Sequence, residues 1–401
     1  MKIVLSGGYD TSNLGDHAML HSLKTSLDKY EKTNITILAR HLEKNIEDDY
    51  NVKLIKNLDH DTKQESMGRW FNGFNLNDNT EHIQQISKEL QSADALIIGG
   101  GRLFVDICLD FMKGPLPYYV LLTIVAKILN IPIIIYGMTI VEPKSNSGKE
   151  MLKFIIENAN LVMVREKGSK NTLALLNIHN NNLHVIPDPA FALLESTNII
   201  TIDSIFKKEN LDLNKEYIGI NLTYRSLNNQ NTNEDYYIKL ASFCDLVYEK
   251  YNTPILFISQ KCYSTDNEYD DDRNLYKIIK EKCKYSQYMF IIKEKYNIFE
   301  TLAIYKKIIM LFSMRRHGLI FAATQNIPIY GLIAEKNTQY ALEEMGLLHN
   351  EIDINYDFNL DMFDKLSSLS DTKYILETNI KKLSIETNNY ARCIINTIKK
   401  D

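Results

Sequence analysis

Short runs of Ile, Val and Leu alternate with longer amphipathic stretches along the first half of the chain. Most runs are continuously apolar, which is typical of strands covered by helices on both faces. The strands predicted here are Lys2–Ser6, Ile35–Ala39, Val52–Lys56, Ala95–Ile98, Ile131–Tyr136, Leu161–Arg165 and His184–Ile186. The helices predicted between them are Gly15–Lys29, Thr80–Leu90, Tyr118–Leu129, Gly148–Glu157 and Lys167–Leu176. This alternation predicts a parallel, doubly wound α/β sheet.

The alternation resumes after a polar, turn-rich stretch at residues 194–214, which we interpret as a linker. The later strands are predicted at Tyr217–Leu222, Pro254–Ile258, Tyr288–Ile292, Ile308–Phe312 and Pro328–Leu332. The later helices are predicted at Glu234–Lys250, Arg273–Lys282, Ile298–Lys306, Gly318–Thr324, Gln339–Met345 and Thr372–Ile398. We therefore expect two Rossmann-like domains that face each other across a cleft, at residues 1–195 and 215–345. A helical tail follows at 346–401, and the Asn-rich segment 57–79 is predicted to be a surface insertion or a mobile loop.

Composition narrows the class of protein. The 401 residues include 46 Lys and Arg against 51 Asp and Glu, a net charge of −5, so we expect no nucleic-acid partner. The opening Met-Lys-Ile-Val-Leu-Ser-Gly-Gly is not a signal peptide, and polar residues interrupt the longest apolar region. The cysteines are odd in number and form no C-x-x-C pair, which indicates free thiols in a reducing cytoplasm. They are Cys108, Cys244, Cys262, Cys283 and Cys393.

A glycine-containing segment from Ser6 to Asp16 follows the opening strand directly. Glycines allow a ligand to approach the backbone closely, and the next helix offers N–H groups to an anion. The segment is neither G-x-G-x-x-G nor a P-loop. Ligand contact by Asn13, Gly15 and Asp16 is one reading, and a tight turn with Asn13 or Asp16 as helix cap is the other. The motif alone leaves both open.

Three consecutive glycines, Gly99, Gly100 and Gly101, follow the strand at 95–98. The charged residues Arg102 and Asp106 come shortly after them, and charge beside bare backbone favours a ligand site. The alternative is a crowded crossover that only glycine fits, with Asp106 capping a helix.

Two further strand ends carry charge. Arg165 ends one strand, where it could contact a ligand or form a surface salt bridge. Asp188 stands between two prolines after the next strand, which holds it rigidly. From that segment alone, a turn acid is the favoured reading of Asp188.

The sharpest motif is Ser313-Met-Arg-Arg-His, in which Arg315, Arg316 and His317 open a helix directly after a buried strand. The positive end of a helix dipole disfavours cations, so the arginines indicate that an anion binds there. A protonated His317 beside that anion could act as a general acid. Lys336 follows the next strand as a further phosphate contact.

An acidic run, by contrast, is interpreted as the acidic start of a helix rather than a cation site. It comprises Asp266, Glu268, Asp270, Asp271 and Asp272.

Together these segments resemble the polysaccharide pyruvyl transferase family. The matching features lie in order over residues 1 to about 345. They are Gly-Tyr-x-x-x-Asn-Leu-Gly-Asp at 8–16, Gly-Gly-Gly to Asp at 99–106, Arg-Glu-x-x-Ser at 165–169, Asp-Pro-Ala-Phe at 188–191, and Ser-x-Arg-x-His at 313–317 with Lys336. The chain departs from the family at 57–79 and at Ala334-Glu335, where members often carry a Tyr-Asp-type pair.

The resemblance implies a GT-B-like pair of domains and a transferase of polysaccharide biosynthesis. Phosphoenolpyruvate would be the donor and a sugar hydroxyl pair the acceptor, giving a pyruvate ketal on a cell-surface glycan such as an exopolysaccharide. The family's critical arginine and histidine correspond to Arg315 and His317, and its upstream arginine corresponds to Arg165.

On this scheme His317 protonates the enol carbon, while Arg315, Arg165 and Arg316 hold the anionic groups. Asp106 is the first candidate for the general base and Asp188 the second. Neither metal nor cofactor is required.

Two alternatives stay open. A GT-B-like glycosyltransferase could use the same groups to clamp the diphosphate of a nucleotide sugar, and a non-catalytic relative could only bind sugars or anions. The acceptor's identity, its attachment to a lipid at the inner membrane face and the oligomeric state are not readable. The Lys-, Ile- and Asn-rich usage suggests a bacterium.

Overall fold

The structure is a computed structural model that describes residues 1–106, 114–195, 202–224, 230–262 and 268–400. The described chain forms two compact units. Unit 1 comprises Met1–Thr11, Asp16–Pro189 and Ile385–Asp401, and unit 2 comprises Ser12–Gly15 and Ala190–Ser384.

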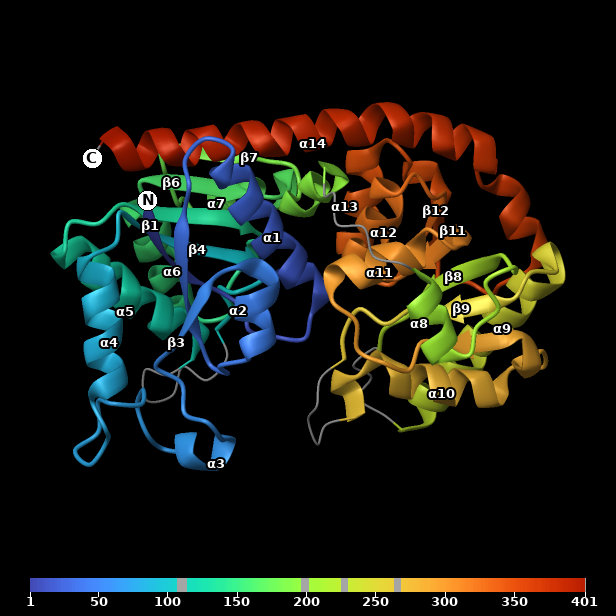
Figure 1. Ribbon diagram of the computed structural model, residues 1–401, viewed down its shortest axis with the longest axis horizontal. Helices are drawn as coiled ribbons and strands as arrows, with labels where there is room; N and C mark the ends of the chain where they lie inside the picture. Colours follow the sequence, from blue (N-terminus) through green and yellow to red (C-terminus); the bar gives the residue numbers. More distant parts are fainter. Residues whose placement is uncertain (107–113, 196–201, 225–229, 263–267, 401) are drawn as a thin grey trace. The chain divides into compact units, whose positions relative to one another are not determined.

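Unit 1 is built on a sheet whose described part has seven strands in the order β3-β2-β1-β4-β5-β6-β7, all parallel to their neighbours (Figure 1). The strands are β1 (Lys2–Ser6), β2 (Asn34–Ala39), β3 (Lys53–Lys56), β4 (Ala95–Gly101), β5 (Ile133–Met138), β6 (Leu161–Val164) and β7 (Leu183–Val185). The helices are α1 (Leu14–Asp28), α2 (Lys44–Tyr50), α3 (Lys63–Ser66), α4 (Glu81–Gln91), α5 (Pro115–Ile128), α6 (Asn146–Asn158) and α7 (Lys167–Leu175).

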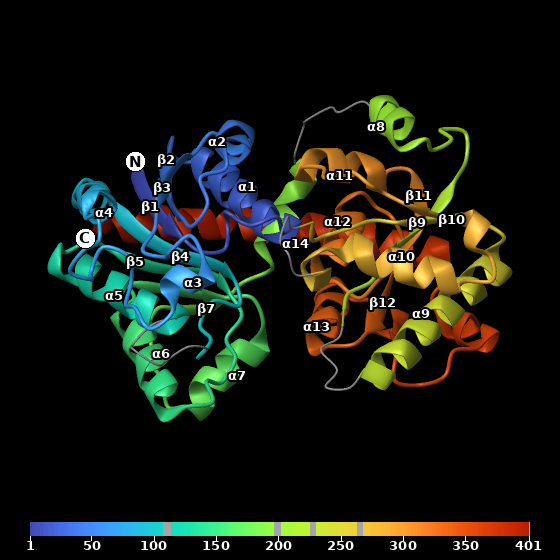
Figure 2. The same ribbon diagram turned by 90° about the horizontal axis from the view of Figure 1, so that it is seen from below.

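Helices cover both faces of this sheet. Val4 and Ile98 belong to one hydrophobic cluster with α4, α5 and α6. Their strand neighbours Leu5 and Ile97 point to the opposite face and are equally buried. Figure 2 shows α1 and α2 on one side of the sheet and α5 and α6 on the other. Burial on both faces is the reason that the strands read as continuous apolar runs.

Unit 2 repeats this design with six described strands in the order β10-β9-β8-β11-β12-β13, again all parallel. The strands are β8 (Tyr217–Asn221), β9 (Ile255–Phe257), β10 (Met289–Ile291), β11 (Ile308–Ser313), β12 (Ile329–Ile333) and β13 (Glu351–Asp353). The helices are α8 (Ile202–Glu209), α9 (Gln230–Tyr251), α10 (Asp272–Lys282), α11 (Ile298–Tyr305), α12 (Arg316–Thr324), α13 (Lys336–Met345) and α14 (Leu369–Lys400).

The predicted fold class, two doubly wound α/β domains, is confirmed. The domain boundaries differ in three places. Segment 12–15 groups with unit 2, and β13 extends the second sheet past residue 345. The predicted linker contains α8, whose Ile205 and Phe206 are buried.

The predicted tail is helical, but α14 belongs to both units. Near its beginning, Asn379 Nδ2 donates to Met345 O in unit 2, at 2.9 Å. Near its end, Asn388 Oδ1 accepts from Ser26 Oγ in unit 1, at 2.8 Å, and Lys399 pairs with Glu31. The final turns therefore complete the first domain.

Segment 57–79 is an ordered part of unit 1 rather than a simple insertion. Phe71 is buried in the same cluster as β1 and β4. The Asp78 carboxylate accepts from Gly73 N at 2.7 Å and from Asn75 Nδ2 at 2.8 Å. Because one buried aromatic anchors many polar residues, the composition of the segment conceals its packing.

Each sheet reverses its strand order once, between β1 and β4 in unit 1 and between β8 and β11 in unit 2. Ligands of open α/β sheets bind beyond the carboxyl ends of the strands at this reversal. The residues after β1, β4, β8 and β11 are therefore the first place to look for a site.

Candidate functional site

In unit 2, the reversal point leads into helix α12. Strand β11 ends at Ser313, and Arg315 precedes the helix with extended backbone and no side-chain cap. The positive end of the α12 dipole therefore stands at the carboxyl end of β11. An anion is the ligand that this position favours.

Arg315 pairs with a buried carboxylate. Its Nη2 donates to Asp272 Oδ1, and the Asp272 side chain is 0% exposed while that of Arg315 is 22% exposed. Burial raises the pKa of Asp272, and the Arg315 guanidinium opposes that rise. Burial lowers the pKa of Arg315, but the charge and hydrogen bond of Asp272 and the nearby Tyr276 and Cys262 together outweigh burial. The net pKa is raised, so the guanidinium stays protonated.

A buried polar network supports the start of α12. Asn221 Oδ1, at the end of β8, accepts from Tyr305 OH at 2.9 Å and from Ser313 Oγ at 3.2 Å. Ser313 Oγ also accepts from Arg315 N at 3.0 Å. A Cβ on Gly318 would lie 2.1 Å from Asn221 Oδ1, so only glycine fits there. This network fixes the backbone on either side of Arg315.

His317 is half-buried in the first turn of α12 and packs against Gly15. A Cβ on Gly15 would lie 2.0 Å from His317 Nδ1, so any other residue would displace the ring. The Phe321 ring lies on the same helix with its centroid 6.0 Å from that of the imidazole. The position of His317 thus explains the glycine of the Asn-Leu-Gly motif.

Segment 12–15 is held to unit 2 by backbone contacts. Leu14 N donates to Gln260 O at 3.1 Å, and Asn13 forms an antiparallel bridge with Lys261. Asn13 Oδ1 accepts from Gly15 N at 3.1 Å, which is the capping role considered for it. The motif after β1 therefore contributes to the second domain.

The other two cationic residues predicted for this site, Arg316 and Lys336, are not placed beside Arg315 as ligand contacts. Arg316 is buried, and its Nη2 donates to Glu344 Oε2 at 2.9 Å. Lys336 is exposed at the start of α13. Arg315 and His317 are the predicted residues that the structure brings to the end of β11.

In unit 1, the glycines at the reversal point are needed first for packing. A Cβ on Gly7 would lie 2.1 Å from Gly99 O, and one on Gly99 would lie 2.4 Å from Tyr136 O. Gly100 and Gly101 have φ of +84° and +81°, a region that favours glycine. The crowded crossover considered as an alternative is present.

The Asp16 carboxylate lies close to Gly8 and Gly101. Cβ atoms on Gly8 and Gly101 would approach its oxygens to 3.4 and 3.5 Å. Thr11 Oγ1 donates to Asp16 Oδ2 at 3.2 Å. Asp16 is therefore at the β1–β4 reversal, where a ligand of unit 1 is expected.

Arg165 also pairs with a buried aspartate. Its Nη1 donates to Asp188 Oδ2 at 2.9 Å and its Nη2 to Thr139 Oγ1 at 2.7 Å. The side chains of Arg165 and Asp188 are 7% and 0% exposed. The surface salt bridge considered for Arg165 is thus a buried ion pair, and Asp188 is more than a turn acid.

Asp106 and Arg102 lie elsewhere in unit 1. Asp106 Oδ2 accepts from Ser145 N at 2.7 Å, and this bond lowers the pKa of Asp106. Ser145 is the N-cap of α6, so Asp106 holds the entry to a helix. Arg102 is exposed.

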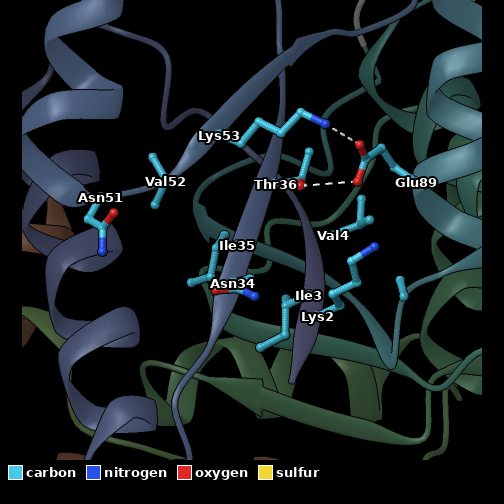
Figure 3. A pocket seen from close by; sticks show the side chains of 11 residues that line it. Lys2, Ile3, Val4, Asn34, Ile35, Thr36, Asn51, Val52, Lys53 and Glu89 are labelled. Atoms are coloured by element: carbon cyan, nitrogen blue, oxygen red, sulfur yellow. Dashed lines mark hydrogen bonds and ion pairs between the residues drawn. The ribbon is translucent and has the colours of Figure 1, made fainter.

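A cavity of about 360 Å³ lies in unit 1 at the amino ends of β1, β2 and β3, whereas the reversal point lies at the carboxyl ends (Figure 3). Figure 3 shows Lys53 and Thr36 both reaching Glu89. Lys2 Nζ in turn donates to Ser92 Oγ at 3.0 Å. Both lysines of the cavity have partners, and the cavity is remote from the reversal point.

Sequence reasoning missed the residues that support Arg315. The acidic run predicts a helix start for Asp272, and the apolar run predicts a strand for Asn221. Neither pattern indicates a role beside Arg315. Asn221 could have been identified as a polar residue at the carboxyl end of an apolar run, which is also the position of Ser313. Asp266 and Cys108 lie outside the described residues.

Within the described ranges, none of the helices combines the length and the apolar character that a membrane span requires. No group of His, Cys, Asp and Glu among the described residues could hold a metal ion. The described cysteines Cys244, Cys262, Cys283 and Cys393 are free thiols.

Solved structures share the whole fold. UDP-GlcNAc 2-epimerase of Methanocaldococcus jannaschii is 13% identical with a TM-score of 0.61, covering 98% of this chain and 99% of its own. The enzyme of Neisseria meningitidis, bound to UDP-GlcNAc, is 15% identical with a TM-score of 0.57 and covers 100% of both chains. Anabaena HepE, solved with UDP and glucose, is 10% identical with a TM-score of 0.63, also over 100% of both. This likeness shows the fold, a two-domain Rossmann-like architecture of the GT-B type.

A search of curated proteins found no match. The polysaccharide pyruvyl transferase family model, however, matches residues 13–334, from Asn13 to Ala334. The match includes the segment around Gly15, the Arg165 strand end and the start of α12. The chain is a transferase that belongs to the polysaccharide pyruvyl transferase family.

Proposed function

We propose that the protein transfers the enolpyruvyl group of phosphoenolpyruvate to two hydroxyls of a sugar. Protonation turns the enol methylene into a methyl group, and the central carbon forms two C–O bonds to the sugar. The C–O bond to phosphate breaks, one hydroxyl proton balances the new methyl group, and the other leaves with the phosphate. The product is a pyruvate ketal on a polysaccharide or its precursor.

The arrangement at the start of α12 carries this proposal. Phosphoenolpyruvate has a carboxylate and a phosphate, so it needs cations and a positive helix end in one place. Arg315 stands at that end, with a protonated guanidinium on a side chain that is 22% exposed. His317 follows in the first turn of the helix and is half-buried, which suits a proton donor beside an anion.

The other residues are assigned their roles through the family motif. Arg165 is assigned to the donor through the family motif, and its guanidinium holds Asp188 and Thr139. Asp106 stays the first candidate base, although its bond from Ser145 N lowers its pKa and therefore its basicity. Asp188 is the second candidate, already in an ion pair.

Titration with phosphoenolpyruvate tests the donor. We expect the donor to raise the melting temperature of the wild-type protein, because a ligand that binds the folded state stabilises it. Arg315→Ala should greatly reduce the rise, while Arg273→Ala, which removes the guanidinium paired with Asp271, should keep it. Incubation with a panel of glycosides should then release phosphate and add the pyruvate mass to one acceptor. No stabilisation of the wild type by phosphoenolpyruvate would refute the donor assignment.

A nucleotide-sugar glycosyltransferase is the second candidate, since structures with the same fold were solved with UDP-GlcNAc and UDP. The same titration with UDP- and GDP-sugars separates the two activities. Stabilisation by a UDP-sugar together with indifference to phosphoenolpyruvate would favour this candidate. Binding of either ligand without turnover of any acceptor would favour a non-catalytic relative.

We also propose that the acceptor is presented at the inner face of the membrane in a bacterial cytoplasm. The family's link to polysaccharides supports a glycan acceptor. Fractionation of cells in low and high salt tests whether the protein associates with the membrane, and recovery only in the soluble fraction would contradict that association.

A further inference from the structure

A buried carboxylate, that of Asp272, pairs with Arg315, the arginine proposed to bind phosphoenolpyruvate. Asp272 is the first residue of α10, but the helix is capped by its neighbour Asp271, whose side chain accepts from Arg273 N. Asp272 is therefore not needed as the cap. Its side chain is 0% exposed and contacts Arg315 instead.

The two carboxylate oxygens of Asp272 have separate partners. Oδ2 accepts from the backbone N–H groups of Gln260 and Lys261, each at 3.0 Å. Oδ1 accepts from Arg315 Nη2. Because the backbone after β9 fixes one oxygen, the other meets the guanidinium in a single orientation.

The pair leaves part of the guanidinium for a ligand. Arginine has five N–H donors, and Asp272 engages Nη2. The Arg315 side chain remains 22% exposed, although Nε itself is buried without a hydrogen-bond partner among the described residues. A free arginine side chain populates many rotamers, and fixing them before the ligand arrives lowers the entropy cost of binding.

We propose that Asp272 is a positioning residue that holds the Arg315 guanidinium in the orientation that receives an anionic group of the donor. This inference rests on the proposed function, in which Arg315 binds phosphoenolpyruvate. It predicts the direction in which donor affinity changes when the carboxylate is removed. A carboxylate that only neutralised Arg315 would weaken anion binding, so its removal would tighten binding, whereas a positioning carboxylate strengthens binding.

The test is a double-mutant cycle on donor affinity, measured by calorimetry. Asp272→Asn keeps the size of the side chain and removes its charge, and we expect it to weaken phosphoenolpyruvate binding roughly tenfold. In the Arg315→Ala background the same change should have almost no effect, which a merely structural role would not produce. KM for the donor should rise, and KM for the acceptor should stay unchanged.

Controls keep the inference falsifiable. Asp271→Asn removes the adjacent carboxylate, which pairs with Arg273, and should leave donor affinity unchanged. If Asp272→Asn does not fold, Asp272→Glu replaces it, since one extra methylene displaces the guanidinium and should also weaken binding. Unchanged or tighter binding in the folded variant overturns the inference.

Failure of the proposed function is distinguishable from failure of this inference. If the wild type binds no phosphoenolpyruvate, the donor assignment fails, and the cycle is read with inorganic phosphate as the probe. Coupling between Asp272 and Arg315 in phosphate binding would then support the positioning role. Absence of coupling with both probes would overturn it.

Discussion

Each unit carries an arginine held by a fully buried aspartate, after β6 in unit 1 and after β11 in unit 2. In unit 1 the Arg165 side chain is 7% exposed and donates to both Asp188 and Thr139. In unit 2 the Arg315 side chain is 22% exposed, and among the described residues its guanidinium donates to Asp272 alone. Nε is buried without a hydrogen-bond partner in both arginines, so the difference lies in exposure and in the number of partners. The same pair is closed in one unit and open in the other.

This difference separates two effects of a buried ion pair. Removing one partner of such a pair is costly, because the remaining charge is uncompensated. Loss of the closed pair should therefore affect mainly the stability of its unit, whereas loss of the open pair should affect mainly ligand binding. Substitutions at the two sites should therefore change different properties of the protein.

Turnover should depend most on the open site. His317→Ala removes the proposed proton donor, and we expect pyruvyl transfer to fall about a thousandfold with circular dichroism unchanged. His349→Ala, at an exposed histidine of the same unit, is the control and should keep full turnover. Near wild-type turnover by folded His317→Ala would remove the histidine from the chemistry.

Stability should depend most on the closed site. Arg165→Ala leaves Asp188 buried and charged, and we expect unit 1 to lose about 3–5 kcal/mol. Arg315→Ala should cost less, because Asp272 keeps its bonds from Gln260 N and Lys261 N. Urea denaturation measures both, and the fluorescence of Trp70, the single tryptophan, reports on unit 1. Equal losses in the two variants would contradict the division.

The contact between Gly15 and His317 gives a steric prediction. Gly15→Ala places a methyl group where the imidazole now lies, so we expect the ring to move and turnover to fall roughly a hundredfold. Gly68→Ala is the control, since a Cβ there meets nothing within 4 Å. That change should alter only stability, through its φ of +62°. Normal turnover in Gly15→Ala would show that the ring position is not critical.

The smallest effect concerns pH. Burial lowers the pKa of His21, on α1 in unit 1, to about 4 from 6.5. The unfolded chain therefore binds more protons between these values, and stability falls as the pH drops through this window. The slope is at most about 1.4 kcal/mol per pH unit. Trp70-monitored urea midpoints at pH 7 and pH 5 measure it, and His21→Gln should flatten the slope.

Much of the fold was predictable because its strands are buried on both faces. Strand β1 was predicted with the same bounds as observed, and β4 and β11 within a few residues, since continuous Ile and Leu runs have few other interpretations. Strand β13 and helix α8 were missed because they are short and lie in polar surroundings. The motif at 313–317 was predicted to lie at a strand end because the apolar run of β11 stops there.

The residues that contact Arg315 and His317 were not predictable from the sequence. Asp272 and Arg315 are 43 residues apart, and they meet because β9 and β11 both lie beside β8. The contact of Gly15 with His317 also depends on where α1 begins. Neighbouring residues such as Asp271 and Asp272 look equivalent in the sequence, and only strand order decides which of them meets the arginine.

Helix α14 has a consequence for synthesis. Unit 1 includes Ile385 to the end of the chain, with Asn388 bonded to Ser26 and Lys399 paired with Glu31. A ribosome therefore releases the final turns long after it has made the first strands. The first domain must wait, incomplete, until translation has passed Ser384, so the second domain can finish folding before it.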